Sequence, residues 1–297
     1  MTHLDEVDAV QSALGDRVRF IAVPDYREPD RQHHLGRGYI ERIRAYHERG
    51  ARIAKFWAAP RGLDYGREFG DPDAMRLDAP ARIEAMETAA ELGMMFMTHV
   101  GDPDTWFRTK YADASTYGTK ADQYEPLERL LERFSQPWIA AHFGGWPEDL
   151  TFVAQLLERH ENLFIDTSAT KWMIREISRQ PRRALIDFLT RFEGRVLFGS
   201  DIVTSDAHLS ETPDDPMGAQ ANNAEQAFDL YASRYWALRV MWETDYVGES
   251  PIADPDLQMV DPERWGPNDA PPLIGKSIPA EVLRAFYGAA AQALLAG

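Results

Sequence analysis

The sequence predicts an α/β protein, and three observations support this fold class. Six short apolar runs look like buried strands. They are nearly continuous in apolar character rather than alternating, which is typical of parallel strands covered on both faces. Amphipathic helical segments separate them, so strand and helix alternate at a spacing of roughly 25–45 residues. Because the composition does not change along the chain, we expect one domain over residues 1–297.

The strands are predicted where apolar and β-branched residues gather between turn-forming residues. The six segments are RVRFIAVP (17–24), RIAKFWAA (52–59), MMFMTHV (94–100), PWIAAHF (137–143), NLFIDTS (162–168) and RVLFGSD (195–201).

Helices are predicted between these strands from apolar residues that recur every three to four positions. Gly50 and Gly93 end the first two, and Pro147 begins another. The tail, 246–297, is rich in proline and acid and is interpreted as a loop followed by a terminal helix. The predicted helices cover 38–50, 79–93, 125–134, 147–160, 182–194, about 222–244 and 279–295.

Composition excludes several classes of function. The net charge is −16, from 48 acidic and 32 basic residues, so a nucleic acid or anionic membrane partner is not expected. The absence of cysteine excludes disulfides, thiolate metal sites and a cysteine nucleophile. The acidic N-terminus does not resemble a signal peptide, and no apolar run reaches the roughly 18 residues of a membrane span. We therefore expect a soluble cytoplasmic protein with a small-molecule substrate.

Four titratable residues lie at the carboxyl ends of predicted strands: His99, His142, Asp166 and Asp201. In a closed (β/α) barrel these ends meet at one mouth, where barrel active sites lie. An open doubly wound sheet is the competing architecture, but no glycine-rich phosphate loop follows the first strand. The strand ends therefore favour a barrel, although six strands are found where an eight-stranded barrel needs eight.

His99, His142 and Asp201 form a candidate metal site of two imidazoles and one carboxylate. Such a set suits Zn²⁺, Mn²⁺ or Fe²⁺ and leaves a position open for water, whose pKa the ion would lower. A second interpretation keeps two of them as ligands and makes His142 the general acid or base. A third treats all of them as a hydrogen-bond network at the barrel mouth.

The motifs THVGDP, AHFGGWPEDL, NLFIDTSA and RVLFGSD, in this order, resemble the amidohydrolase-2 branch of the amidohydrolase superfamily. The segment SPIADPD and the terminal helix also fit, so the resemblance runs from about residue 15 to the C-terminus. It implies a (β/α)₈ TIM-type barrel and a metal-dependent hydrolase or decarboxylase. His99 matches the metal-ligand histidine of strand five, His142 the strand-six ligand or acid/base, and Asp201 the strand-eight aspartate that binds metal and handles protons.

By this resemblance the six strands are strands three to eight, and strands one and two are missing. Relatives carry a His-x-His ligand pair on strand one. This sequence has none, because His33 and His34 are adjacent and lie in a loop. An incomplete barrel would hold a divalent ion, zinc by expectation, less well. It would also expose strand edges that could pair with a second copy as a homodimer.

Five further residues are candidates for supporting roles. Lys55 and Trp57 lie on the strand-four segment and are expected to contact substrate; Lys55 could instead bridge metals as a carboxylated lysine or form a salt bridge. Lys171 and Trp172 are further substrate-contact candidates. Asp166 is expected either to orient a ligand histidine or to cap the turn that follows it.

The segment 101–122 is long for a barrel loop and carries four aromatic residues together with the cations Arg108 and Lys110. Arg108 is the substrate-binding candidate there, and Asp102 is interpreted as stabilising the turn after His99. The segment is expected to be a lid over an aromatic or carboxylated substrate, or a loop folded on its own aromatics or on a neighbouring subunit. The residues concerned are Trp106, Phe107, Arg108, Lys110, Tyr111 and Tyr117.

Three functions follow from these observations. The first is a metal-dependent hydrolase of the amidohydrolase type, acting on a small carbonyl or carboxylate compound through a metal-activated water. The second is a metal-independent lactonase, or a decarboxylase, on the same barrel. The third is an inactive partial barrel that binds a ligand or a partner protein.

Overall fold

The computed structural model describes residues 2–204, 206–209 and 221–296. The chain forms two compact units. The first comprises residues 1–146 and 151–165, and the second comprises residues 147–150 and 166–297.

The first unit is an α/β unit built on parallel strands. Each strand pairs with the next one along the chain, in the order β1-β2-β3-β4-β5. This sequential order is that of a TIM-type barrel. The strands are β1 (Ile21–Ala22), β2 (Ile53–Trp57), β3 (Met95–His99), β4 (Trp138–Ala140) and β5 (Leu163–Asp166). The helices are α1 (Val7–Leu14), α2 (Arg31–Leu35), α3 (Arg37–Glu48), α4 (Gly62–Arg67), α5 (Pro80–Glu91), α6 (Asp104–Phe107), α7 (Ala114–Tyr117), α8 (Tyr124–Arg133), α9 (Ala141–Gly144) and α10 (Leu150–Arg159).

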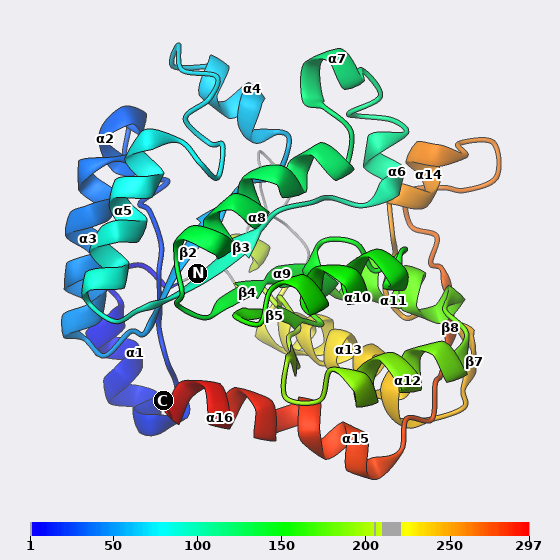
Figure 1. Ribbon diagram of the computed structural model, residues 1–297. Coiled ribbons are helices and arrows are strands. Elements are labelled where there is room, and N and C mark those ends of the chain that lie inside the picture. Colours follow the sequence, from blue (N-terminus) through cyan, green and yellow to red (C-terminus); the bar gives the residue numbers. More distant parts are fainter. Residues whose placement is uncertain (1, 205, 210–220, 297) are drawn as a thin grey trace. The chain divides into compact units, whose positions relative to one another are not determined.

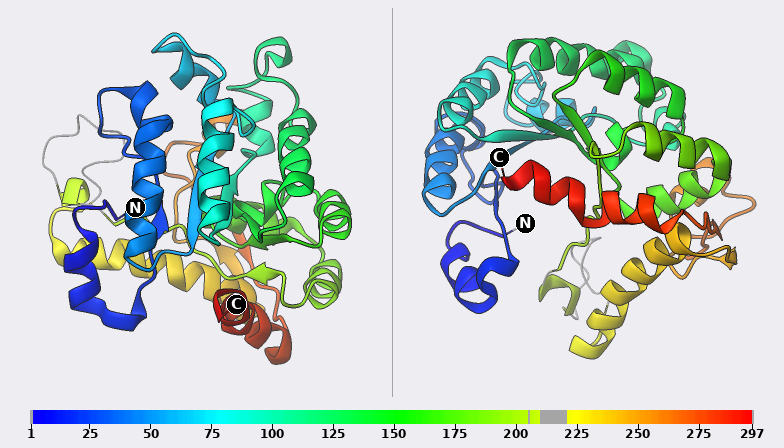
Figure 2. Two further views of the ribbon diagram at one scale, coloured as in Figure 1. Left: turned by 60° about the vertical axis from the view of Figure 1, so that its left-hand side comes forward. Right: turned by 60° about the horizontal axis from the view of Figure 1, so that its bottom comes forward.

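Strand register sorts the side chains of β2 and β3 onto two faces. Lys55 pairs with Met97 and Trp57 pairs with His99, so these four residues share one face. The opposite face is buried against helices. Tyr39 of α3 packs edge-on against Phe56 at 5.4 Å, and its hydroxyl donates to the carbonyls of Ala22 and Lys55. Figures 1 and 2 show α3 and α5 side by side in this layer. The candidate residues Lys55, Trp57 and His99 therefore lie on the face of the sheet opposite these helices.

The second unit is mainly helical around a buried ion cluster. Arg175 is 2% exposed and pairs with Glu176, Asp254 and Asp256. The elements are α11 (Thr170–Arg179), α12 (Arg182–Arg191), β6 (Val196–Leu197), α13 (Ala224–Glu243), β7 (Val247–Glu249), α14 (Asp256–Val260), β8 (Pro272–Ile274), α15 (Ala280–Arg284), a π-helical turn (Ala285–Ala289) and α16 (Ala290–Ala296).

The α/β fold class is confirmed, and each of the six predicted strands contains an observed strand. The interpretation of 246–278 as a loop is wrong, because β7 and β8 form an antiparallel pair there. Strands of three residues, separated by about 20 residues and carrying a proline, leave no alternating pattern to detect. The helix α11 was not predicted either. No helix among the described residues is long and apolar enough to cross a membrane.

Candidate active site

Two close-packed turns bring His99 and His142 together in the first unit. His99 is the last residue of β3, and His142 lies two residues beyond β4. The turns touch at two glycines: a Cβ on Gly101 would lie 3.0 Å from the carbonyl oxygen of Gly145. A Cβ on Gly145 would lie 2.9 Å from the Tyr124 hydroxyl oxygen. The glycines of GDP and HFGG are therefore needed for the approach of the two loops.

The turn after β4 has an unusual backbone. His142, Phe143, Gly144 and Gly145 all have positive φ, at 61°, 56°, 69° and 83°. A non-glycine residue in this region costs about 1–2 kcal/mol. The Tyr124 hydroxyl stabilises the turn by donating to the Gly144 carbonyl at 2.9 Å. Strain of this kind is concentrated at functional sites, which supports a role for His142.

A chain of hydrogen bonds runs from His142 to Tyr111. The Nε2 atom of His142 lies 2.9 Å from Nδ1 of His99. The Nε2 atom of His99 lies 3.0 Å from Oδ1 of Asp102, and the Tyr111 hydroxyl donates to Oδ2 of Asp102 at 2.7 Å. All four side chains are mostly or fully buried.

The ionised state of Asp102 fixes the protons in this chain. Burial alone would raise the pKa of Asp102, but the hydrogen bonds from His99 and Tyr111 and the charge of Arg61 hold it below its ordinary value. Burial and the Asp102 charge raise the pKa of Tyr111, which therefore stays protonated. An ionised carboxylate only accepts, so Nε2 of His99 donates to it. When both rings are neutral, Nδ1 of His99 accepts from Nε2–H of His142. The lone pair of His142 then lies on Nδ1.

A cavity of about 510 Å³ opens beside Trp57, whose ring contacts His99 edge-on at 6.1 Å. The two acidic residues that line this cavity both form ion pairs, Asp64 with Arg67 and Glu68 with Arg31. Its volume is in the range of small-molecule sites. The lining residues are Val23, Pro24, Tyr26, Lys55, Trp57, Arg61, Asp64, Tyr65, Glu68 and Met75.

Among the substrate-binding candidates of the first unit, the structure places Lys55 and Trp57 in this cavity. Arg108 is exposed at the end of α6 and is not among the lining residues.

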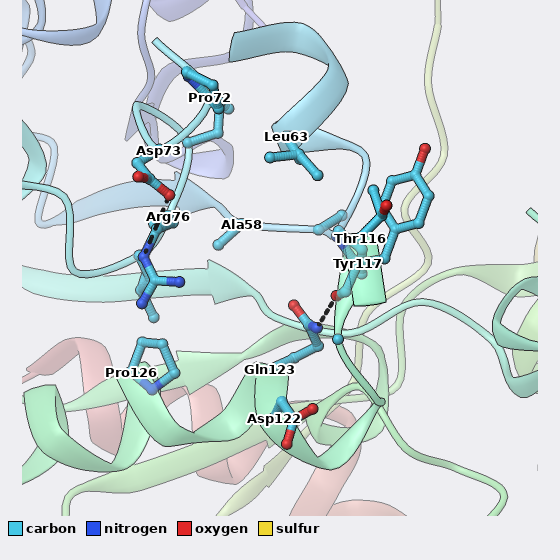
Figure 3. A pocket seen from close by; sticks show the side chains of 16 residues that line it. Ala58, Leu63, Pro72, Asp73, Arg76, Thr116, Tyr117, Asp122, Gln123 and Pro126 are labelled. Atoms are coloured by element: carbon cyan, nitrogen blue, oxygen red, sulfur yellow. Dashed lines mark hydrogen bonds and ion pairs between the residues drawn. The ribbon is translucent and has the colours of Figure 1, made fainter. Parts of the chain in front are cut away.

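The segment 101–122 is folded on its own aromatics within the first unit. The Tyr111 ring lies 5.3 Å from that of Phe107 and 5.1 Å from that of Tyr117. Tyr117 donates to Asp64 of α4 at 2.9 Å, which joins the segment to the cavity wall. A smaller cavity of about 240 Å³ lies between α4, α7 and the start of α8 (Figure 3), and its polar side chains include Asp73, Arg76 and Gln123.

The other candidates lie in the second unit. Asp166 accepts from the backbone N–H and the hydroxyl of Ser168, so it stabilises the turn after β5. Trp172 is buried and donates to Glu148 at 2.9 Å. Desolvation and the Arg234 charge lower the pKa of Lys171.

Asp201, also in the second unit, is exposed, has a φ of 51°, and its charge acts on Arg234. The structure thus brings together the two histidines of the predicted metal set, while the carboxylate belongs to the other unit.

Three residues of the site were missed or undervalued. Asp102 was interpreted as a turn residue and Tyr111 as a lid aromatic, whereas the structure puts both in the hydrogen-bond chain. The spacing His99-x-x-Asp102 is a signal that could have been used. Arg61 lines the cavity, and the only feature of the sequence that indicates this is its position a few residues after a predicted strand.

Comparisons with known proteins give one family. The family model described as Amidohydrolase matches residues 5–296. No curated protein matches the chain.

Solved structures resemble it weakly. A probable 2-pyrone-4,6-dicarboxylic acid hydrolase from Acinetobacter baumannii is 14% identical, with a TM-score of 0.41 over 77% of this chain and 70% of that one. A dihydroxybenzoic acid decarboxylase from Polaromonas sp. JS666, solved with manganese and 2-nitroresorcinol, is 14% identical, with a TM-score of 0.44 over 99% and 73%. A 2,6-dihydroxybenzoate decarboxylase from Rhizobium is 15% identical, with a TM-score of 0.37 over 100% and 89%.

Proposed function

The chain belongs to the amidohydrolase family, and from this premise we propose that it is a hydrolase acting on a small carbonyl compound that carries a carboxylate. One observation carries the proposal: the hydrogen-bond chain from His142 through His99 to Asp102 and Tyr111, next to the cavity lined by Trp57. A histidine oriented by a second hydrogen-bonded group is the arrangement that general base catalysis needs.

In the proposed step, His142 takes a proton from the attacking water at Nδ1. The water oxygen forms a bond to the carbonyl carbon, and the bond from that carbon to its leaving oxygen or nitrogen breaks. His142 can pass its Nε2 proton to His99, whose positive charge is then stabilised by the ionised Asp102. The Nδ1 proton of His142 is finally given to the leaving atom, and His99 returns its Nδ1 proton to Nε2 of His142, so the site ends in its starting state.

The family is metal-dependent, and the sequence resemblance implies His99, His142 and Asp201 as its ligands. The described residues do not fit a metal as they stand. No group of three or more histidines and acids among them could hold an ion. The facing nitrogens of the two histidines are 2.9 Å apart, a hydrogen-bond distance, whereas two nitrogens on one tetrahedral zinc at about 2.05 Å would lie roughly 3.3 Å apart. No step above is therefore routed through a metal.

The test is turnover of a panel of carboxylated lactones and cyclic amides in ¹⁸O-water. We expect ¹⁸O in the product acid and a loss of about 10²- to 10⁴-fold in kcat for His142→Asn. His47→Asn, a histidine on α3, is the matched control and should turn over normally. Release of CO₂ without ¹⁸O uptake, or unchanged turnover by His142→Asn, would contradict the proposal. Elemental analysis of the wild type and Asp201→Asn, with activity before and after chelation, tests the ligand set.

A further inference from the structure

Arg61 occupies an unusual position beside the candidate site. It follows β2, lines the 510 Å³ cavity, and places its guanidinium carbon 4.9 Å from the Trp57 ring centre and 5.8 Å from that of Trp106. Cation–π contacts of this kind hold an arginine over an aromatic face without using its N–H donors. Its five donors therefore stay available.

The charge of Arg61 is not neutralised by an ion pair among the residues that the structure describes. Neighbouring arginines differ in this respect, because Arg31 pairs with Glu68 and Arg67 pairs with Asp64. These two pairs use both acids of the cavity wall. The charge of Arg61 acts on the buried Asp102 carboxylate, but among the described residues no carboxylate lies within 4 Å of its guanidinium.

A second hydrogen-bond donor belongs to the surroundings of Arg61. The indole N–H of Trp106 is buried and has no hydrogen-bond partner in the described structure. It belongs to one of the two rings that the guanidinium of Arg61 contacts.

We infer that Arg61 is the residue that binds the carboxylate of the substrate. The inference rests on the proposed function and names a specificity-determining residue for it. A guanidinium presents two parallel donors that match the two oxygens of a carboxylate. The aromatic walls of the cavity, Tyr26, Trp57 and Tyr65, fit a planar ring attached to that carboxylate.

The test is calorimetric titration with benzoate and with benzamide, which has the same ring without the charge. The wild type should bind benzoate at least tenfold more tightly than benzamide. Arg61→Met should weaken benzoate binding by about ten- to hundredfold and leave benzamide binding unchanged, and Arg61→Lys should restore part of the loss. Arg183→Met is the matched control, because Arg183 is exposed on α12, pairs with Asp187 and does not line the cavity; this variant should bind benzoate as the wild type does.

Equal binding of benzoate by the wild type and Arg61→Met would overturn the inference, and so would equal binding of benzoate and benzamide by the wild type. Competition by inorganic phosphate as strong as that of benzoate would overturn it too, since Arg61 would then serve a bare anion. Titration needs no turnover, so these results stand apart from the test of the hydrolase.

Discussion

Replacing Asp102 with asparagine tests the hydrogen-bond chain directly, because the change removes a charge and keeps the volume. Asp102 is 4% exposed and accepts from two donors, Nε2–H of His99 at 3.0 Å and the Tyr111 hydroxyl at 2.7 Å. An asparagine side chain has one oxygen and one NH₂ group. It can therefore accept from one of these donors only.

The expected loss in the free energy of unfolding follows from the hydrogen bonds that Asp102 accepts from His99 and Tyr111. The donor that loses its acceptor stays buried, at a cost of about 1–3 kcal/mol, and the bond that remains weakens from charged to neutral by about 1 kcal/mol. Removing a buried carboxylate relieves its desolvation and offsets about 1 kcal/mol of this loss. We expect the free energy of unfolding to fall by about 2 kcal/mol. If the asparagine NH₂ faces His99, the proton of that ring moves from Nε2 to Nδ1.

Urea unfolding measures the first effect, and long-range ¹H–¹⁵N NMR of the histidine rings measures the second. Asp113→Asn is the matched control. Asp113 caps α7 at the surface by accepting from the backbone N–H of Ser115, and asparagine caps equally well. The control should stay within about 0.5 kcal/mol of the wild type. An Asp102→Asn variant with wild-type stability and an unchanged His99 spectrum would refute the assigned chain.

Three further predictions concern the scaffold of the site. Arg82→Met should lower the free energy of unfolding by about 2–4 kcal/mol in urea, because the 2%-exposed arginine donates to two backbone carbonyls that would lose their partner. Gly145→Ala should lower the free energy of unfolding by at least about 1 kcal/mol more than Gly50→Ala in the same assay. Both glycines have φ near +84°, but an added Cβ meets atoms within 3.4 Å only at Gly145. Equal losses would argue against the close approach of the two turns. Asp25 has its pKa held at about 2, by the Arg27 hydrogen bond foremost, against 3.8 unfolded. The contribution of the Asp25 carboxylate to stability is present above pH 3.8 and is lost as the pH falls through about 2. Asp25→Asn should therefore be at most about 2 kcal/mol less stable than the wild type at pH 5 and equally stable near pH 2. A stability difference that persists at pH 2 would contradict this.

The strands of the sheet could be predicted because a strand that is buried on both faces is apolar over most of its length, and this is visible in the sequence. The segments at 52–59 and 94–100 are apolar apart from Arg52, Lys55, Thr98 and His99, and both form parallel strands. The short strands β7 and β8 could not be predicted, because their stability comes from pairing between distant segments rather than from local preference.

The residues of the candidate site could also be predicted only in part. His99 and His142 could be placed at the ends of neighbouring strands from local pattern alone, because apolar runs and glycine-rich turns mark where strands end. The hydrogen bonds that join these rings to one another and to Asp102 could not be predicted, since they depend on side-chain direction to within a few tenths of an ångström in the folded chain. The position of Arg61 between Trp57 and Trp106 could not be predicted either, because it depends on two loops that are 45 residues apart in the chain.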